Sequence, residues 1–262
     1  MSTTRDERAV RVLVTREDPR PVEDAVVLAG GKPVGLSLLV TRWLPFEIPG
    51  GRRLADYDWV AFTSVRALQG LVAEAERLGW DWPPEVPSAA VGDRTAHELQ
   101  ARGWMPECVS DDRSARGLVE CLSARDVVGA RILFPCSAIA EPTFPEGMRQ
   151  SGAQVDVVSV YTTESTWARD PQKKAELESR LVEALEDDAV ATCASPSAAR
   201  ALAELAEAAG VIERLRATPI VVIGPTTAKA VHGLGLQAVE AGGRSLACMA
   251  RKAVEVGRKT QA

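Results

Sequence analysis

The chain carries nearly the same pair of short motifs twice, and this duplication is the feature that most constrains its fold. The spacing G-x-x-T-A-x6-G occurs at Gly92–Gly103 and again at Gly224–Gly235. A serine at a predicted strand end precedes each copy, Ser64 by 28 positions and Ser195 by 29. The repeated unit is far longer than that of a solenoid. The duplication therefore predicts two similar lobes that face one another, with a ligand between them.

Short apolar segments of strand length alternate with amphipathic segments of helix length. Glycine follows most of the predicted helices, where it accepts the left-handed conformation that ends a helix. Strands separated by helices of this length indicate parallel α/β sheets. The predicted extended segments are 10–15, 34–44, 59–63, 88–91, 132–134, 155–161, 189–193 and 220–223, and the predicted helices are 21–29, 65–78, 95–102, 116–122, 143–150, 171–185, 196–209, 226–234 and 245–256.

Composition argues against several classes of protein. A net charge of −5 disfavours a nucleic-acid surface, which needs a basic face. No stretch approaches 18 uninterrupted apolar residues and the charged N-terminus lacks an apolar signal-peptide core, so we expect no membrane partner and a cytoplasmic location. The five cysteines are odd in number and form no C-x-x-C pair, and there are only two histidines. We therefore expect neither a disulfide framework nor a metal site.

Hydroxyl-bearing residues stand where predicted strands end and helices begin. Ligands of parallel α/β sheets bind beyond the carboxyl ends of the strands, and helix N-termini attract anions. The same residue types are also preferred N-caps, so capping is the better explanation of each of them when it is taken alone. Their occurrence in duplicate favours ligand contact. The candidates for carboxylate or phosphate contact are Ser64, Thr95, Ser195, Ser197, Thr226 and Thr227.

Tyr161 is one of two tyrosines and ends an apolar segment. A phenol can donate a proton to a departing hydroxyl, although a tyrosine at a strand end is also a common packing residue. The arginines Arg16, Arg66, Arg94 and Arg113 could pair with substrate carboxylates. No G-x-G-x-x-G or G-x-x-x-x-G-K-[ST] motif occurs, so nucleotide-dependent chemistry is not expected.

Taken together, these motifs resemble those of the uroporphyrinogen-III synthase family. The matching segments are V-L-V-T-R (12–16), D-W-V-A-F-T-S-V-R-A-L (58–68), A-V-G-D-R-T-A (90–96), R-S-A-R-G-L (113–118), V-Y-T-T (160–163), S-P-S-A (195–198) and I-G-P-T-T-A (223–228). The resemblance implies two flavodoxin-like parallel-sheet α/β domains joined by two extended connectors. One domain would contain residues 1–42 and 166–262, and the other residues 43–165.

The resemblance also implies an activity. The family closes linear hydroxymethylbilane to uroporphyrinogen III in a cleft between the domains, with loss of the terminal hydroxyl and with no metal or cofactor. Tyr161 would be the proton donor, and backbone amides and hydroxyls would bind the substrate. A monomer with a small-molecule substrate and no nucleic-acid or membrane partner is the family expectation. Further substrate-binding residues implied by the resemblance are Thr15, Thr63, Gly92, Cys136, Ser137 and Gly224.

The chain departs from the family pattern after the predicted strand 132–134. Related sequences tend to have P-R-S-D-I-A-T-E there, whereas this chain has P-C-S-A-I-A-E-P, so that Cys136 replaces an arginine and Ala138 an acidic residue. Loss of a cationic contact would weaken binding of a polycarboxylate. Two alternatives therefore stay open. One is a paralogue in natural-product biosynthesis that closes a polyketide-like chain by dehydration and conjugate addition, and the other is a non-catalytic ligand-sensing protein.

Overall fold

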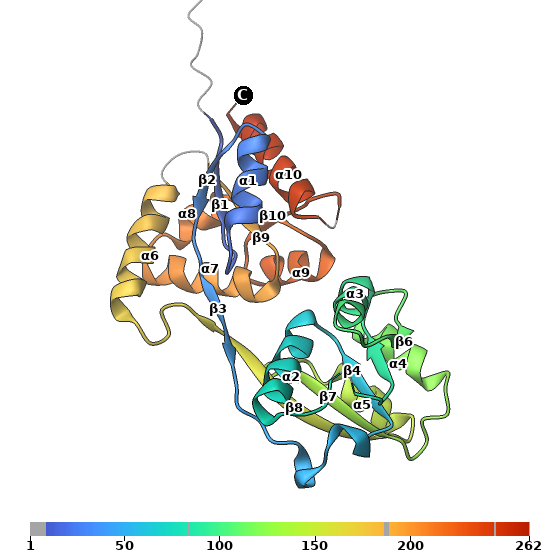
Figure 1. Ribbon diagram of the computed structural model, residues 1–262. Helices are drawn as coiled ribbons and strands as arrows, with labels where there is room; N and C mark the ends of the chain where they lie inside the picture. The colour runs from blue at the N-terminus through green and yellow to red at the C-terminus, as the bar shows by residue number, and fades with distance from the viewer. Residues whose placement is uncertain (1–8, 83, 186–188, 244, 262) are drawn as a thin grey trace, which may run out of the picture. The chain divides into compact units, whose positions relative to one another are not determined.

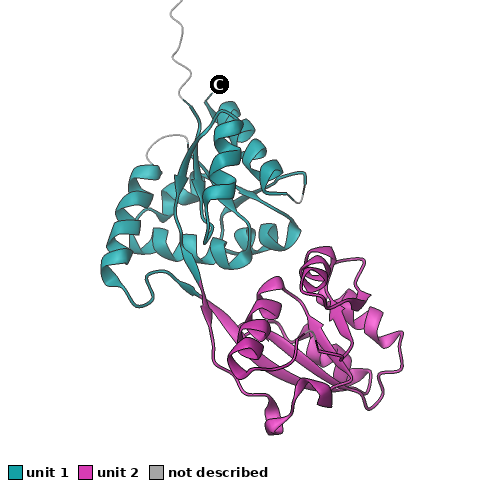
Figure 2. Cartoon of the chain, viewed as in Figure 1, with its two compact units in different colours: residues 1–40, 164–262 teal, residues 41–163 magenta. Residues whose placement is uncertain are grey.

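The computed structural model describes residues 9–82, 84–185, 189–243 and 245–261. The chain forms two compact units, unit 1 from Met1–Val40 with Glu164–Ala262 and unit 2 from Thr41–Thr163 (Figure 2). Both unit boundaries fall inside strands, β3 (Leu39–Trp43) and β8 (Gln154–Ser165), which carry the chain from one unit to the other. The charged N-terminal segment used in the prediction of location lies outside the described residues. No described helix is long and apolar enough to cross a membrane.

Unit 1 contains a five-stranded parallel sheet in the order β2-β1-β9-β10-β11 (Figure 1). Its strands are β1 (Arg11–Val14), β2 (Lys32–Gly35), β9 (Val190–Cys193), β10 (Pro219–Val222) and β11 (Gln237–Glu240), and its helices are α1 (Arg20–Leu28), α6 (Pro171–Ala184), α7 (Pro196–Ala208), α8 (Ile212–Ala217), α9 (Pro225–Gly233) and α10 (Leu246–Thr260). Val12 and Val14 pack with α1 and α10, whereas Leu13 packs on the opposite face with α6, α7 and α9. The inner strands are apolar throughout because both faces are covered.

Unit 2 contains a six-stranded sheet in the order β3-β8-β7-β4-β5-β6. Its remaining strands are β4 (Trp59–Phe62), β5 (Ser88–Ala90), β6 (Pro106–Val109) and β7 (Arg131–Ser137), its helices are α2 (Val65–Leu78), α3 (Asp93–Ala101), α4 (Ala115–Ser123) and α5 (Thr143–Gln150), and two short 3-10 helices are η1 (Pro49–Gly51) and η2 (Leu54–Asp56). Val60 and Phe62 pack with α2 and α3, whereas Ala61 packs with α4 and α5 on the other face.

The duplicated motifs occupy equivalent places in the two sheets. When β7, β8 and β4 are matched to β1, β2 and β9, the order β8-β7-β4-β5-β6 repeats the order β2-β1-β9-β10-β11. Unit 2 adds β3 at its edge, and its β7–β8 pair follows β4–β6 in the chain instead of preceding them. The predicted class, two parallel-sheet α/β lobes of flavodoxin type, is confirmed.

Several predicted elements need correction. The extended segment 34–44 is not one element, because β2 ends at Gly35, β3 begins at Leu39, and the two strands belong to different sheets. No prediction covers β6, β11 or α8. Both strands are four residues long, lie at the edge of a sheet and are only partly buried, so neither carries a continuous apolar run.

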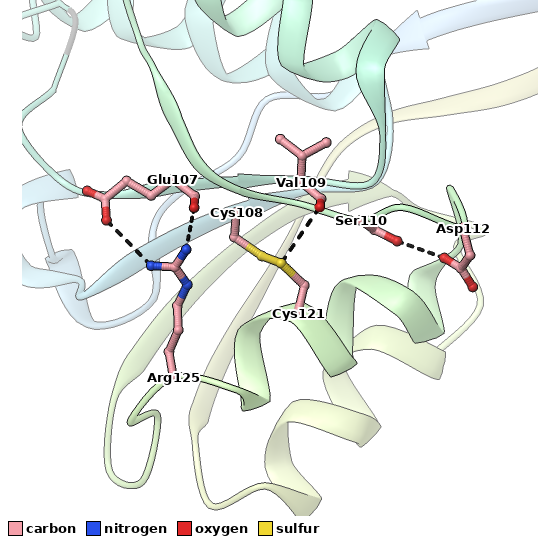
Figure 3. Close-up of a disulfide and its surroundings, with 7 residues drawn as sticks. All are labelled: Glu107, Cys108, Val109, Ser110, Asp112, Cys121 and Arg125. Carbon is pink, nitrogen blue, oxygen red and sulfur yellow. Dashed lines mark hydrogen bonds and ion pairs between the residues drawn. A yellow bond between two sulfur atoms is a disulfide. The ribbon is translucent and has the colours of Figure 1, made fainter.

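No disulfide framework was predicted from the sequence, but one pair of cysteines forms a disulfide. Cys108 on β6 and Cys121 on α4 are bonded, with Cα atoms 6.4 Å apart (Figure 3). The pairing arises because α4 packs against the edge strand β6, which brings together two cysteines 13 positions apart. This spacing matches no short cysteine motif, so only the tertiary packing reveals it. Cys136, Cys193 and Cys248 are free thiols.

Candidate functional site

The predicted site residues of unit 2 gather at the carboxyl ends of its parallel strands. Ser137 ends β7 and lies opposite Tyr161 on β8 in the sheet register. Thr63 and Ser64 follow β4, and Gly92 follows β5. Arg66 and Arg94 are exposed in the first turns of α2 and α3. The sheet therefore brings these residues to one edge, although 98 positions separate Thr63 from Tyr161 in the sequence.

Ser64 and Tyr161 meet directly. The Ser64 Oγ lies 3.3 Å from the Tyr161 phenol oxygen and also accepts the Ala67 backbone N–H at 3.0 Å. Ser64 is thus the N-cap of α2, as the capping interpretation predicts. Tyr161 is 9% exposed as a residue, and its ring packs edge-to-face on Trp43, with ring centroids 6.2 Å apart. Tyr161 is therefore a well-fixed phenol beside a second hydroxyl.

The loop after β6 covers the start of α3. Arg113 has φ of 56°, the left-handed region that costs a non-glycine residue about 1–2 kcal/mol. Its guanidinium donates to the Asp93 carboxylate, with Nη2 and Oδ2 2.6 Å apart. A Cβ added to Gly92 would lie 2.9 Å from the Arg113 Cγ, so this close approach requires a glycine. Arg113, a candidate carboxylate partner, is thus already paired inside the chain.

Asp112 organises the same loop. It accepts the Ser110 hydroxyl at 2.7 Å and both the backbone N–H and the hydroxyl of Ser114, at 2.9 and 2.6 Å (Figure 3 shows the Ser110 bond). The hydrogen bonds from Ser114 and Ser110 hold the pKa of the Asp112 carboxyl below its usual value. A Cβ on Gly117 would collide with Asp112 and Ser110, so the loop folds tightly onto α4 only because residue 117 is glycine.

In unit 1 the predicted residues also follow the strands, but several serve the fold. Thr15 is fully buried after β1, and its hydroxyl donates to the Thr192 carbonyl at 2.7 Å. Ser195 caps α7 by accepting the Ala198 N–H at 3.2 Å, and its Oγ lies 3.1 Å from that of Ser197. Arg16, the residue after Thr15, is half-buried. These placements leave the Thr15 hydroxyl engaged inside the protein.

The four duplicated helix N-termini fall into two kinds. Ser64 and Ser195 cap α2 and α7, whereas α3 and α9 begin after Gly92 and Gly224, and no described side chain caps them. The first N–H groups of an uncapped helix need partners from outside it, and anions suit them. Ligand contact therefore suits the α9 terminus, whereas the loop that carries Arg113 covers the start of α3.

The threonines of the G-x-x-T-A motifs are placed unequally. Thr95 and Thr227 stand at the third position of α3 and α9 and are each 4% exposed, so they pack against the protein. Thr226 is exposed, and a Cβ added to Gly224 would meet no atom within 4 Å. Thr226 and Gly224 are therefore accessible at the start of α9, whereas Arg113 covers Gly92.

Cys136, predicted to contact substrate, is 4% exposed and packs in the core with the residues of α4 and α5. Burial raises the pKa of its thiol to about 11. Cys193 is also fully buried, and burial raises its thiol pKa too. Cys248 is half-buried, and hydrogen bonds with Ser245 and Arg251 hold its thiol pKa below the usual value.

This difference predicts the alkylation pattern of the native protein. Iodoacetamide near pH 8 is expected to modify Cys248 and to leave Cys136 and Cys193 unmodified, because only the accessible thiolate reacts. Peptide mass spectrometry after quenching measures this, and denaturant should expose all three thiols. Labelling of Cys136 at the rate of Cys248 in the folded protein would contradict the buried position of Cys136.

A surface cavity of about 280 Å³ lies elsewhere in unit 2. It is lined by Val72, Ala75, Glu76, Trp80, Trp82 and Arg102. None of these is a predicted site residue. In the described part of the chain, no group of three or more histidine, cysteine, aspartate or glutamate side chains could hold a metal ion.

Comparison with known proteins identifies the family of this chain. The family model described as uroporphyrinogen-III synthase HemD matches residues 25–247. A Methanothermobacter thermautotrophicus protein named "Putative uroporphyrinogen-III synthase" is 28% identical over 193 residues, which cover 72% of this chain and 74% of the relative.

Two solved structures share the fold. A mutant uroporphyrinogen III synthase of Thermus thermophilus has a TM-score of 0.66 at 19% identity, covering 96% of this chain and 100% of its own. The uroporphyrinogen-III synthetase of Helicobacter pylori has a TM-score of 0.64 at 16% identity, covering 95% and 100%. With the family model matching most of its length, this chain belongs to the uroporphyrinogen-III synthase family.

Proposed function

We propose that the protein is a ring-closing lyase that converts hydroxymethylbilane to uroporphyrinogen III with loss of water. The observation that carries this proposal is the family match over residues 25–247. The position of Tyr161 supports it, since the phenol lies at the carboxyl ends of the unit 2 strands, where ligands of parallel α/β sheets bind. Family and fold together support the more general role of a cyclase of the uroporphyrinogen-III synthase type.

In the proposed reaction the Tyr161 phenol gives its proton to the terminal hydroxyl of the substrate, which leaves as water. The carbon that loses the hydroxyl becomes an azafulvene-type electrophile. The substituted α-carbon of the last pyrrole attacks it and forms a spiro intermediate. The bond from that α-carbon to the preceding bridge carbon then breaks, and the free α-carbon of the same pyrrole bonds to that bridge carbon, which inverts the last pyrrole and closes the ring. The α-carbon that formed the last bond loses its proton, and the Tyr161 phenolate takes it up. One water leaves for each ring closed and there is no net oxidation or reduction, so the chemistry needs no redox cofactor.

Substrate binding is assigned to the loops at the carboxyl ends of the strands. The uncapped start of α9 offers the backbone N–H and the hydroxyl of the exposed Thr226 to a carboxylate. Arg66 and Arg94 add positive charge at the starts of α2 and α3. Orientation of a flexible chain is the main demand of ring closure and can contribute roughly 7–11 kcal/mol to catalysis.

A less anionic substrate is the second candidate, and the segment 135–142 favours it. This segment runs from the last residues of β7 into the following loop and contains no cation, while Cys136 is buried and Ala138 exposed. A macrocyclisation by dehydration and conjugate addition would use the same proton donor on a chain with fewer carboxylates. It differs from the first candidate in substrate and keeps the fold and the leaving group.

An assay with hydroxymethylbilane distinguishes the two candidate functions. The purified chain is supplied with it, and the ratio of isomers III and I in the cyclised product is measured against the spontaneous reaction without protein. The proposal expects product strongly enriched in isomer III. A ratio equal to that of the spontaneous reaction would sink the proposal and turn attention to the less anionic substrate.

A further inference from the structure

Ser64 is the described residue whose side chain is hydrogen-bonded to the proposed proton donor. Its Oγ lies 3.3 Å from the Tyr161 oxygen, and either atom could donate. The Ser64 oxygen already accepts the Ala67 N–H, which leaves its own hydrogen to be donated. If Tyr161 gives its proton to the substrate, the arrangement that remains is donation from Ser64 to the phenol oxygen.

The rest of the Tyr161 residue is held independently of Ser64. Its backbone carbonyl accepts the Ala138 N–H at 2.8 Å, which fixes β8 against the end of β7. Trp43 packs against the ring. Gly70 lets α2 approach β8, because a Cβ there would lie 2.8 Å from Val160. Backbone and ring are thus fixed, and the direction of the phenol O–H bond is what Ser64 can set.

We propose that Ser64 is a positioning residue, which donates to the Tyr161 oxygen, aims the phenol proton toward the substrate and stabilises the phenolate once that proton has left. The inference rests on the proposed role of Tyr161 as proton donor. Hydrogen bonds strengthen when the acceptor becomes charged, so the Ser64 bond is worth more after proton transfer than before it. The positive end of α2, which begins at Ser64, acts in the same direction. Ser64 therefore affects turnover more than substrate binding, whereas a residue that only contacts the substrate would mainly affect binding.

Three substitutions in the full chain separate capping from positioning. Ser64→Thr keeps both the cap and the donor, and Ser64→Asp keeps an acceptor for Ala67 but has no hydrogen to donate. Ser64→Ala removes both. We expect Ser64→Ala to lower kcat by about 10- to 100-fold, the loss of one hydrogen bond to a charged group, with KM changed less than about twofold. Ser64→Asp should lower kcat by at least as much, because its carboxylate lacks the donor and also repels the phenolate. Ser64→Thr should stay within about threefold of the parent kcat.

Stability is followed in parallel. Ser64→Ala should lower Tm, whereas Ser64→Asp should keep it near that of the parent. Ser245→Ala is the matched control, because Ser245 caps α10 by accepting the Cys248 N–H at 3.1 Å and has no proposed role in the site. It should lower Tm and leave kcat unchanged.

Each variant is also made with Tyr161→Phe. With no phenol to position, Ser64→Ala should add no further loss of kcat, and this non-additivity measures the coupling. Parent-like kcat in Ser64→Asp, or a raised KM with unchanged kcat in Ser64→Ala, overturns the inference while leaving the proposed function intact. An inactive parent chain instead removes the proposed function, and the inference with it. A fully active Tyr161→Phe variant removes the proton-donor role on which the inference rests and leaves the proposed function intact.

Discussion

Tyr161→Phe is expected to lower kcat for ring closure by about 10²- to 10⁴-fold, the usual contribution of a positioned general acid. KM should change little, because the ring, its packing on Trp43 and the backbone pairing of β8 all remain. The only described side-chain hydrogen bond removed is that with Ser64, at 3.3 Å, so the free energy of unfolding should fall by less than about 1 kcal/mol. Steady-state kinetics with hydroxymethylbilane measures the first effect, and urea unfolding the second.

Tyr57 supplies the matched control, since it is the other tyrosine of the chain. It is 5% exposed, and its hydroxyl donates to the Asp156 carboxylate at 2.7 Å; burial, and then that hydrogen bond, raise the pKa of the phenol. Tyr57→Phe should cost about 1–2 kcal/mol of unfolding free energy, because Asp156 loses a donor, and should leave kcat unchanged. If Tyr161→Phe retains the parent kcat, the proton donor is another group.

Removing the disulfide between Cys108 and Cys121 is expected to lower the free energy of unfolding by about 3 kcal/mol. The estimate follows from the loop that the bond closes, whose ends are 13 positions apart, because a cross-link restricts the unfolded chain. Equilibrium unfolding in urea, with and without dithiothreitol, measures the difference. The bond also joins β6 to α4, the two elements that flank the loop carrying Arg113.

The double substitution Cys108→Ala with Cys121→Ala is the control for the reductant. Its stability should not respond to dithiothreitol, whereas that of the parent should. Thiol titration in denaturant gives a direct count, three free thiols before reduction and five after it. Five thiols in protein that was never reduced would show that the bond does not form, and the expected stability difference would disappear with it.

Helix limits were predictable where local chemistry sets them. α2 spans Val65–Leu78, as predicted, because Ser64 caps its start and Gly79 ends it at φ of 67°. The edge strands β6 and β11 were not predicted, because half-exposed segments of four residues show no clear alternation of apolar and polar residues. The split of 34–44 into β2 and β3 depends on which sheet each half pairs with, and that pairing is a long-range choice.

The candidate site was predictable as residue types and not as contacts. The strand-end motifs located Ser64, Gly92, Ser195 and Gly224, and the structure places all four at helix N-termini. The sequence did not show which of these helix N-termini are capped by a serine side chain and which are uncapped, and the structure was needed to distinguish them. Thr15 and Cys136 lie inside the protein. Their burial was not predicted, because the sequence pattern at a strand end does not say which side of the sheet a side chain faces.

The sequence by itself determined the α/β class, most helix limits and the duplication, because capping, glycine termination and strand hydrophobicity act over a few neighbouring residues. Only the tertiary structure decided that both sheets share one strand order. It also decided that the chain enters that order at a different strand in unit 2, where β4–β6 come before β7 and β8. It also decided that Ser64 meets Tyr161, 97 positions away, and that Cys108 meets Cys121. These contacts arise from strand pairing and helix packing between distant segments, which no local pattern encodes.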